Sequence, residues 1–307
     1  MNKFTKLSFL TCLLTVVFLS ACKKEYETIQ ATESATIASY ISKNNLSAVM
    51  LPDPDKSGFF YQVTSPGTGN NFKNPDSVLY NLTVKSLSTG ATYLQSPLLS
   101  NLGTFVGYTD QFYNSSLVTT SNPQGFYSIP AIRTALLALK PGGVARILLP
   151  SYLAFGRNGA GNIPSNEIVD LIVTTYPYQK QALLDDNRIT TFLTSKGLTA
   201  TKDPSGIYYI VNTLGTGEAV NGIGSTVNVK YTGRTLDGAV FDSSADGLAL
   251  TLSGLVPGWQ IMIPKFKVGT KFRMILPSAY AYGRSGFNTI SPNTSLDFDI
   301  EIVSVTN

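Results

Sequence analysis

The side chains that could do chemistry in this chain are carboxylates, phenols, hydroxyls and a single indole. The 307-residue sequence contains no histidine, and its two cysteines, Cys12 and Cys22, both lie within the first 22 residues. The lack of histidine excludes histidine-based catalytic triads and most zinc and copper sites. We expect no metal and no other cofactor, and the chemistry is left to the carboxylates, phenols, hydroxyls and the indole of Trp259.

One phrase of the sequence occurs twice. RILLPSYLAFGRNGAGNIPSN begins at Arg146, and RMILPSAYAYGRSGFNTISPN begins at Arg273, an offset of 127 residues. Further upstream, SGFFYQVTSPGTG in the first copy matches SGIYYIVNTLGTG in the second at an offset of 148. A repeat of this length indicates two copies of one domain. Because the offset falls from 148 to 127, the first copy holds about 21 extra residues between Tyr93 and Ile132.

Each copy has the pattern of a short helix followed by several strands. In the second copy, LLDDNRITTFLTSKGL (183–198) has apolar residues near helical spacing, with Asp185 and Asp186 expected as a charge pair at the helix N-terminus. GIYYIV (206–211), TVNVKYTG (226–233) and LDFDIEIVSV (296–305) read as strands, the last two alternating as a half-buried strand does. PGWQIMIPKFKVG (257–269) suits a short helix. A sheet that wraps one short helix is an α+β architecture.

The motifs of the second copy come in a recognisable order: VNVKYTGRTLDGAVFDSS, then GLVPGWQ, then VGTKFRMILPSAYAYG, then SPNTSLDFDIEI. Over residues 203–307 this order resembles the FKBP family of peptidyl-prolyl cis-trans isomerases. The resemblance implies two tandem FKBP-like domains, each a curled antiparallel β-sheet around one short helix and each preceded by a short N-terminal helix. It also implies a proline-binding pocket between sheet and helix.

The resemblance assigns a role to individual residues of the second copy. The expected catalytic residues are Asp242, Tyr282, Tyr231 and Trp259. The expected substrate-binding residues are Phe241, Leu248, Val256, Ile290 and Phe298. Two positions depart from the family, since Leu248 stands where an aromatic residue is common and Phe287 where a histidine is frequent. Taken singly, most of these residues would be ordinary core or sheet residues, and only their joint order favours a pocket.

The first copy lacks the polar groups of this set. Its residues at the four catalytic positions are Leu94 for Asp242, Phe155 for Tyr282, Ile132 for Trp259, and either Leu82 or Thr83 for Tyr231. We therefore expect residues 36–178 to form a degenerate FKBP-like domain with little isomerase activity, and residues 183–307 to form the isomerase domain. The extra residues of the first copy are expected near the mouth of its pocket.

The first 22 residues have the pattern of a lipoprotein signal peptide. Lys3 and Lys6 precede the apolar stretch 7–19, which is too short to span a bilayer, and LSAC ends at Cys22. We interpret LSAC as a lipobox and Cys22 as the lipidation site, which gives near-permanent membrane anchoring. Residues 23–35 are expected to be a polar tether, the alternative being that they pack against the first domain.

The charge balance bears on partners and location. Losing Lys3 and Lys6 lowers the formal net charge from +4 to +2, so nucleic acid is not an expected partner. The expected partners are proline-containing polypeptides, macrolide inhibitors and the membrane. Lys23 directly after Cys22 favours the outer membrane of the cell envelope. Two other functions stay open: a non-catalytic FKBP-like binding module or chaperone, and a carbohydrate-binding surface lipoprotein.

Overall fold

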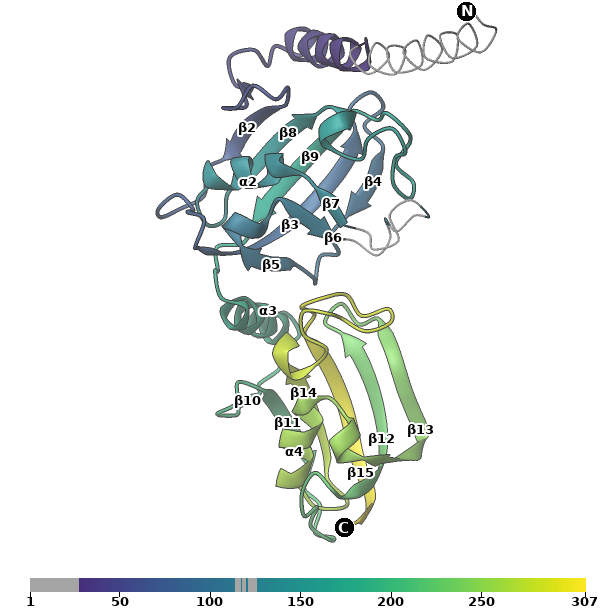
Figure 1. The fold of residues 1–307 in the computed structure, drawn as a ribbon. Coiled ribbons are helices and arrows are strands. Elements are labelled where there is room, and N and C mark those ends of the chain that lie inside the picture. The colour runs from purple at the N-terminus through teal and green to yellow at the C-terminus, as the bar shows by residue number, and fades with distance from the viewer. Residues whose placement is uncertain (1–27, 114–116, 118–119, 121–125) are drawn as a thin grey trace, which may run out of the picture.

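The computed structural model describes residues 28–113, 117, 120 and 126–307 (Figure 1). The predicted signal peptide, the lipobox and Cys22 lie outside these residues. In the part of the chain that is described, no helix is both long and apolar enough to cross a membrane.

Two antiparallel sheets with the same strand order form the body of the structure (Figure 1). The first has the order β1 (Leu51–Pro52), β2 (Phe60–Ser65), β8 (Val144–Leu149), β9 (Val169–Thr175), β3 (Ser77–Ser86) and β4 (Thr92–Gln95), with β5 (Leu102–Phe105) also paired to β3. The second has the order β10 (Thr201–Lys202), β11 (Tyr208–Thr213), β14 (Lys271–Leu276), β15 (Leu296–Thr306), β12 (Thr226–Thr235) and β13 (Val240–Thr251). The predicted α+β architecture is confirmed.

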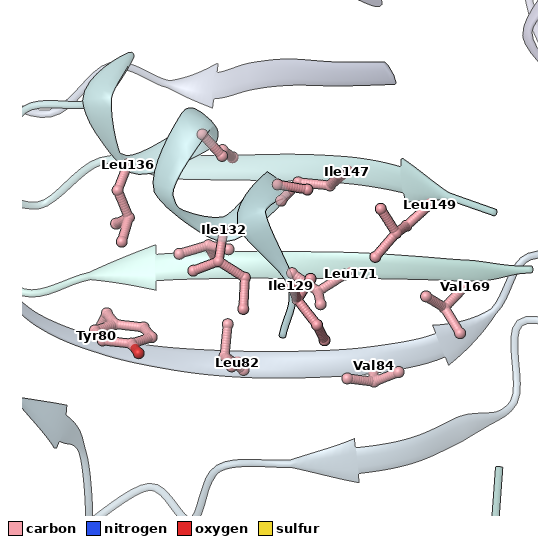
Figure 2. Packing of buried hydrophobic residues seen from close by; sticks show 14 of the residues in the cluster. Tyr80, Leu82, Val84, Ile129, Ile132, Leu136, Ile147, Leu149, Val169 and Leu171 are labelled. Atoms are coloured by element: carbon pink, nitrogen blue, oxygen red, sulfur yellow. The ribbon is translucent and has the colours of Figure 1, made fainter. Parts of the chain in front are cut away.

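One short helix packs on each sheet, as the sequence predicted. These helices are α2 (Pro130–Leu137) and α4 (Pro257–Met262), and each begins with proline, whose fixed φ and missing N–H suit the first helical position. Figure 2 shows α2 lying across the first sheet, with Ile132 on the side of Leu82 and Leu136 on the side of Tyr80. All four side chains are buried, so this layer forms the core of the first domain.

A further helix precedes each sheet: residues 28–43 in the first copy and α3 (Gln181–Ser195) in the second. Each is joined to its domain by one buried carboxylate. Glu33 accepts hydrogen bonds from the N–H and the hydroxyl of Ser151, at 2.8 and 2.6 Å, and Asp185 accepts the same pair from Ser278, also at 2.8 and 2.6 Å. The two contacts are equivalent, which extends the repeat to the N-terminal helices.

These contacts correct two expectations. Residues 28–35 are not a tether, because they belong to the first helix and Glu33 is buried against Ser151. Asp185 is not half of an exposed charge pair at a helix end, because its carboxylate is fully buried, and this burial raises its pKa. Only Asp186 lies near the surface, where it pairs with Lys202.

The extra residues of the first copy interrupt the sheet edge that is continuous in the second. Where β13 runs unbroken beside β12, the first copy has β4, a connection over residues 96–101, and β5. A two-stranded ribbon of β6 (Gln111–Tyr113) and β7 (Phe126–Ser128) follows. Further short helices within the described residues are η1 (Val106–Tyr108), η3 (Ser151–Leu153), η4 (Leu252–Gly254), η5 (Ile263–Lys265) and η6 (Ser278–Tyr280).

Candidate active site

A cavity of about 290 Å³ lies in the second domain, between α4 and strands β12, β13 and β15. Its lining combines aromatic and aliphatic side chains with one carboxylate: Tyr231, Phe241, Asp242, Leu250, Gly254, Leu255, Val256, Trp259, Tyr282, Phe287 and Phe298. Seven of the nine residues predicted for the pocket are therefore brought together here. Leu248 and Ile290 are the two that do not line the cavity.

The indole of Trp259 is the centre of an aromatic cluster. Its ring meets those of Tyr231 and Phe298 edge to face, with centroids 5.3 and 5.4 Å apart, and Phe298 meets Phe241 at 5.7 Å. Edge-to-face contacts at these distances are favourable and fix ring orientation. Gly233 permits this packing, because a Cβ there would lie 2.7 Å from ring atoms of both Phe241 and Phe298. The cluster gives the cavity a rigid apolar floor.

One hydrogen bond joins two of the polar side chains that line the cavity. The hydroxyl of Tyr231 donates to a carboxylate oxygen of Asp242 at 2.7 Å. Burial, together with this bond, raises the pKa of Tyr231 to about 12. Burial also raises the pKa of Tyr282, with a smaller contribution from the negative charge of Asp242. Both phenols therefore stay protonated at neutral pH and remain hydrogen-bond donors.

Val256 precedes the first residue of α4 and has an extended backbone. Within the described residues its N–H donates no hydrogen bond. Since Val256 lines the cavity, this N–H is a donor that a bound carbonyl group can use. A donor left unpaired at a helix start is normally satisfied by water or by a ligand.

The rim of the cavity differs from the prediction. Phe287 stacks on Tyr282, with ring centroids 5.0 Å apart and an interplanar angle of 13°. Phe287 stands where the family frequently has a histidine, and it was not among the residues predicted for the pocket. Ile290 pairs with Phe287 in an isolated bridge, and its side chain is buried in the core instead of lining the cavity.

The prediction for Leu248 is wrong. Its side chain is 45% exposed, and Leu250 lines the cavity in its place. β13 is irregular just before Leu248: Tyr231 pairs with Ser244 but Val229 pairs with Leu248, so β13 has two extra residues between these pairs. Because the number of extra residues is even, the alternation of side chains is preserved, so Leu248 and Leu250 share one face of β13 and the cavity reaches only Leu250. Leu255 and Gly254, which also line the cavity, were not predicted.

Comparison with known proteins agrees with this geometry. The family model for FKBP-type peptidyl-prolyl cis-trans isomerases matches residues 217–303, which include every residue of the cavity. FK506-binding protein 1 of Saccharomyces cerevisiae is 40% identical over 88 residues, which cover 77% of that protein and 27% of this chain. The chain belongs to the FKBP family.

Other relatives match a similar share of the chain. The FKBP-type peptidyl-prolyl cis-trans isomerase FkpA of Escherichia coli K12 is 38% identical over 104 residues, which are 33% of this chain and 38% of FkpA. The chain thus spans well under half the length of that relative. The crystal structure of E. coli FkpA has 32% identity, covers 41% of this chain and 59% of that one, and gives a TM-score of 0.37.

The first domain has the FKBP strand order with another set of side chains. Leu82 pairs with Val173 as Tyr231 pairs with Ile300, and this register resolves the choice between Leu82 and Thr83 in favour of Leu82. Val84 pairs with Leu94 as Gly233 pairs with Asp242. Leu94 therefore stands at the Asp242 position, as the alignment predicted.

The position of the pocket in the first domain is filled. Ile132, at the Trp259 position, and Ile129, at the Val256 position, are both 0% exposed. Tyr127, on β7 of the ribbon, contacts the ring of Phe155 at 5.1 Å and donates a hydrogen bond of 2.9 Å to the carbonyl of Leu117. Leu117 itself is 2% exposed and belongs to the core. The extra residues thus supply side chains that cover the place where the second domain has its cavity.

Proposed function

We propose that this protein is a peptidyl-prolyl cis-trans isomerase whose second domain acts on X–Pro bonds of envelope or secreted polypeptides. The observation that carries this proposal is the aromatic cavity over Trp259 with the Tyr231–Asp242 hydrogen bond at its side. A cavity of about 290 Å³ with an apolar floor suits a prolyl ring, which is compact and has no N–H of its own.

The energetics of the reaction suit such a site. Rotation about an X–Pro bond has a barrier of ~18–20 kcal/mol and takes ~10–100 s without a catalyst. A thousandfold acceleration requires only ~4 kcal/mol of preferential binding to the transition state. In the transition state the amide is twisted and has lost its resonance, so it is less polar than the planar amide. An apolar cavity therefore favours the twisted form.

The polar groups act by hydrogen bonding and charge. The Val256 N–H binds a substrate carbonyl beside the prolyl ring, and the Tyr282 hydroxyl donates a second hydrogen bond across the cavity. Asp242, held by Tyr231, places a negative potential near the rotating carbonyl group, whose carbon is electron-poor. Bonds that fit only the twisted geometry stabilise the transition state. No covalent intermediate and no cofactor is needed.

An isomerisation assay on short proline peptides with the full chain tests this proposal. Trp259→Ala removes the floor and Asp242→Leu removes the carboxylate, and each is expected to lower kcat/KM at least tenfold. Asp246→Leu is the matched control, because Asp246 is an exposed carboxylate on the same strand outside the cavity. Wild-type protein that leaves the uncatalysed rate unchanged would refute the proposal.

A second function is supported by the first domain. Its filled pocket argues for a non-catalytic role there, as an FKBP-like binding module or chaperone. If so, the full chain suppresses aggregation of an unfolded protein, and Asp242→Leu keeps this activity while losing isomerisation. Equal loss of both activities in that variant would contradict a separate binding role.

We further propose that the protein is a lipoprotein of the cell envelope, anchored through Cys22. The support is the basic start, the short apolar stretch and the LSAC sequence. Lys23 after the lipidated residue favours the outer membrane.

A further inference from the structure

The two domains meet at the interrupted edge of the first sheet. In the connection between β4 and β5, the hydroxyl of Ser100 donates to the carbonyl of Pro292 at 2.7 Å. The amide of Asn293 donates to the carbonyl of Asn101 at 2.9 Å, and both residues are buried. Arg188, on α3, donates to the carbonyl of Ser100 at 3.0 Å and to the side chain of Asn101 at 3.1 Å. Because buried polar groups are paired across the contact, the two domains have a defined docking geometry.

A groove of about 770 Å³ opens beside this contact, more than twice the volume of the cavity over Trp259. One wall belongs to the first domain and includes Tyr80, Gln95 and Thr104, and the other belongs to the second and includes Arg284 and Pro292. Among the described residues that line the groove, Arg284 alone carries a charge. The other polar groups are amides and hydroxyls, which match the neutral N–H and C=O groups of a peptide backbone.

Tyr80 is the feature of this groove that points to a ligand. Its side chain is 3% exposed, and within the described part of the chain its hydroxyl makes no hydrogen bond. Figure 2 shows its ring on β3 at the end of the row formed with Leu82 and Val84. The hydroxyl is not among the buried polar atoms that lack a partner, so it opens into the groove, where it can donate a hydrogen bond to a bound acceptor. In the second domain the equivalent residue is Val229, so the FKBP fold does not require a phenol here.

The groove adjoins the candidate active site through one short segment. Tyr282 and Phe287 line the cavity over Trp259, while Arg284, Ser285 and Pro292 line the groove. Residues 282–293 therefore form part of the boundary of both. A polypeptide that occupies both the cavity and the groove would cross this segment.

We propose that the groove is a second binding subsite for the extended, proline-containing polypeptide whose X–Pro bond occupies the cavity over Trp259. Tyr80 donates a hydrogen bond to a backbone carbonyl of that polypeptide, at a position beyond the reach of a tetrapeptide. The first domain thus contributes to substrate affinity without an active pocket of its own. This inference rests on the proposed isomerase function for the identity of the ligand.

The test compares a long ligand with a short one on the full chain. The long ligand is labelled, reduced and carboxymethylated α-lactalbumin, and its binding is measured by fluorescence anisotropy. The short ligand is a proline tetrapeptide, and its cis-trans isomerisation rate is measured. Tyr80→Phe removes only the hydroxyl and is expected to weaken binding of the unfolded protein about fivefold, the effect of one hydrogen bond. Thr104→Tyr, which places a ring in the groove, is expected to weaken it further. Turnover of the tetrapeptide stays unchanged in both variants.

Tyr108→Phe is the matched control, because Tyr108 is exposed and does not line the groove. Unchanged binding of the unfolded protein by both Tyr80→Phe and Thr104→Tyr would overturn the subsite. The subsite would also be overturned if a neutral oligosaccharide displaced the bound α-lactalbumin and an unlabelled polypeptide did not. Failure of the wild type to turn over the tetrapeptide, with groove-dependent binding intact, would overturn the isomerase proposal alone.

Discussion

The hydroxyl of Tyr231 donates a hydrogen bond of 2.7 Å to Asp242 across the neighbouring strands β12 and β13. The first domain keeps the same strand pair but has Leu82 and Leu94 at these positions. Both domains fold with the same strand order, so the hydrogen bond is not what the architecture requires. Its presence only beside the open cavity favours a role in chemistry over a role in folding.

We expect the two members of this pair to contribute unequally to catalysis. Asp242→Asn keeps an acceptor but removes the charge, and kcat/KM should fall roughly tenfold, since bonds to charged groups contribute about 1.5–3 kcal/mol. Tyr231→Phe removes the donor that holds Asp242, and kcat/KM should fall roughly fivefold. Peptide isomerisation at neutral pH measures both. A larger loss in Tyr231→Phe than in Asp242→Asn would contradict the assignment of Asp242 as the charged partner.

The raised pKa of Tyr231 predicts a pH window for stability. The unfolded phenol titrates near pH 10, and the folded one has a pKa of about 12. The folded state therefore holds the proton more tightly, and this contribution to the free energy of unfolding is complete below pH 10 and lost as pH rises through 12. Urea denaturation should show a constant difference between wild type and Tyr231→Phe below pH 10, which shrinks above it. A difference that grows with pH would contradict the shift.

Most residues of the candidate site could be predicted because they belong to local sequence motifs. Each predicted catalytic residue belongs to a short sequence motif: Tyr231, Asp242, Trp259 and Tyr282. The order of these motifs identified the family. The same repeat located Ile132 and Phe155 in the first domain. Local sequence could not choose between Leu82 and Thr83, because that choice depends on strand register, which only the pairing with β9 defines.

The errors have a common cause in contacts between distant parts of the chain. Leu248 lies outside the cavity although it shares a face of β13 with Leu250, and no local residue pattern reports how far along the strand the cavity extends. Residues 28–35 looked like a polar tether because one face of their helix is solvent-exposed, while the burial of Glu33 depends on Ser151, 118 residues away. Asp185 was misjudged for the same reason, since its partner Ser278 is 93 residues away.

We expect macrolides that mimic a twisted prolyl amide to bind the cavity. Because Trp259 is the only tryptophan of the chain and lines the cavity, binding should change its fluorescence. Ligand at one hundred times its Kd should also stabilise the fold by about 2.7 kcal/mol, measurable as a rise in Tm. Trp259→Leu should show no such rise. A saturating macrolide that changes neither signal in the wild type would refute this prediction.

Anchoring through Cys22 predicts a change in membrane partition. Cys22→Ser removes the thiol that accepts the lipid, so the variant should remain as a precursor or become soluble after cell lysis. Cys12→Ser is the matched control, because Cys12 lies in the apolar stretch of the predicted signal peptide, away from the proposed lipidation site. Fractionation with and without detergent measures the outcome. A normally processed Cys22→Ser protein that still needs detergent for extraction would contradict lipidation at this residue.

The filled pocket of the first domain predicts that nearly all isomerase activity comes from the second. The full chain with Asp242→Leu and Trp259→Leu has a silent second cavity, so any remaining activity reports the first domain. Because the first domain lacks two or three hydrogen bonds of ~1 kcal/mol each, the remaining isomerase activity of this double variant should be about one hundredth of the wild-type activity. Residual activity within threefold of wild type would contradict this.

Ile132→Trp should not restore a site in the first domain, because Ile132 is fully buried and overpacking there costs about 1–3 kcal/mol of stability. A lowered Tm without a gain in activity for Ile132→Trp would distinguish a filled pocket from an open one that merely lacks its indole.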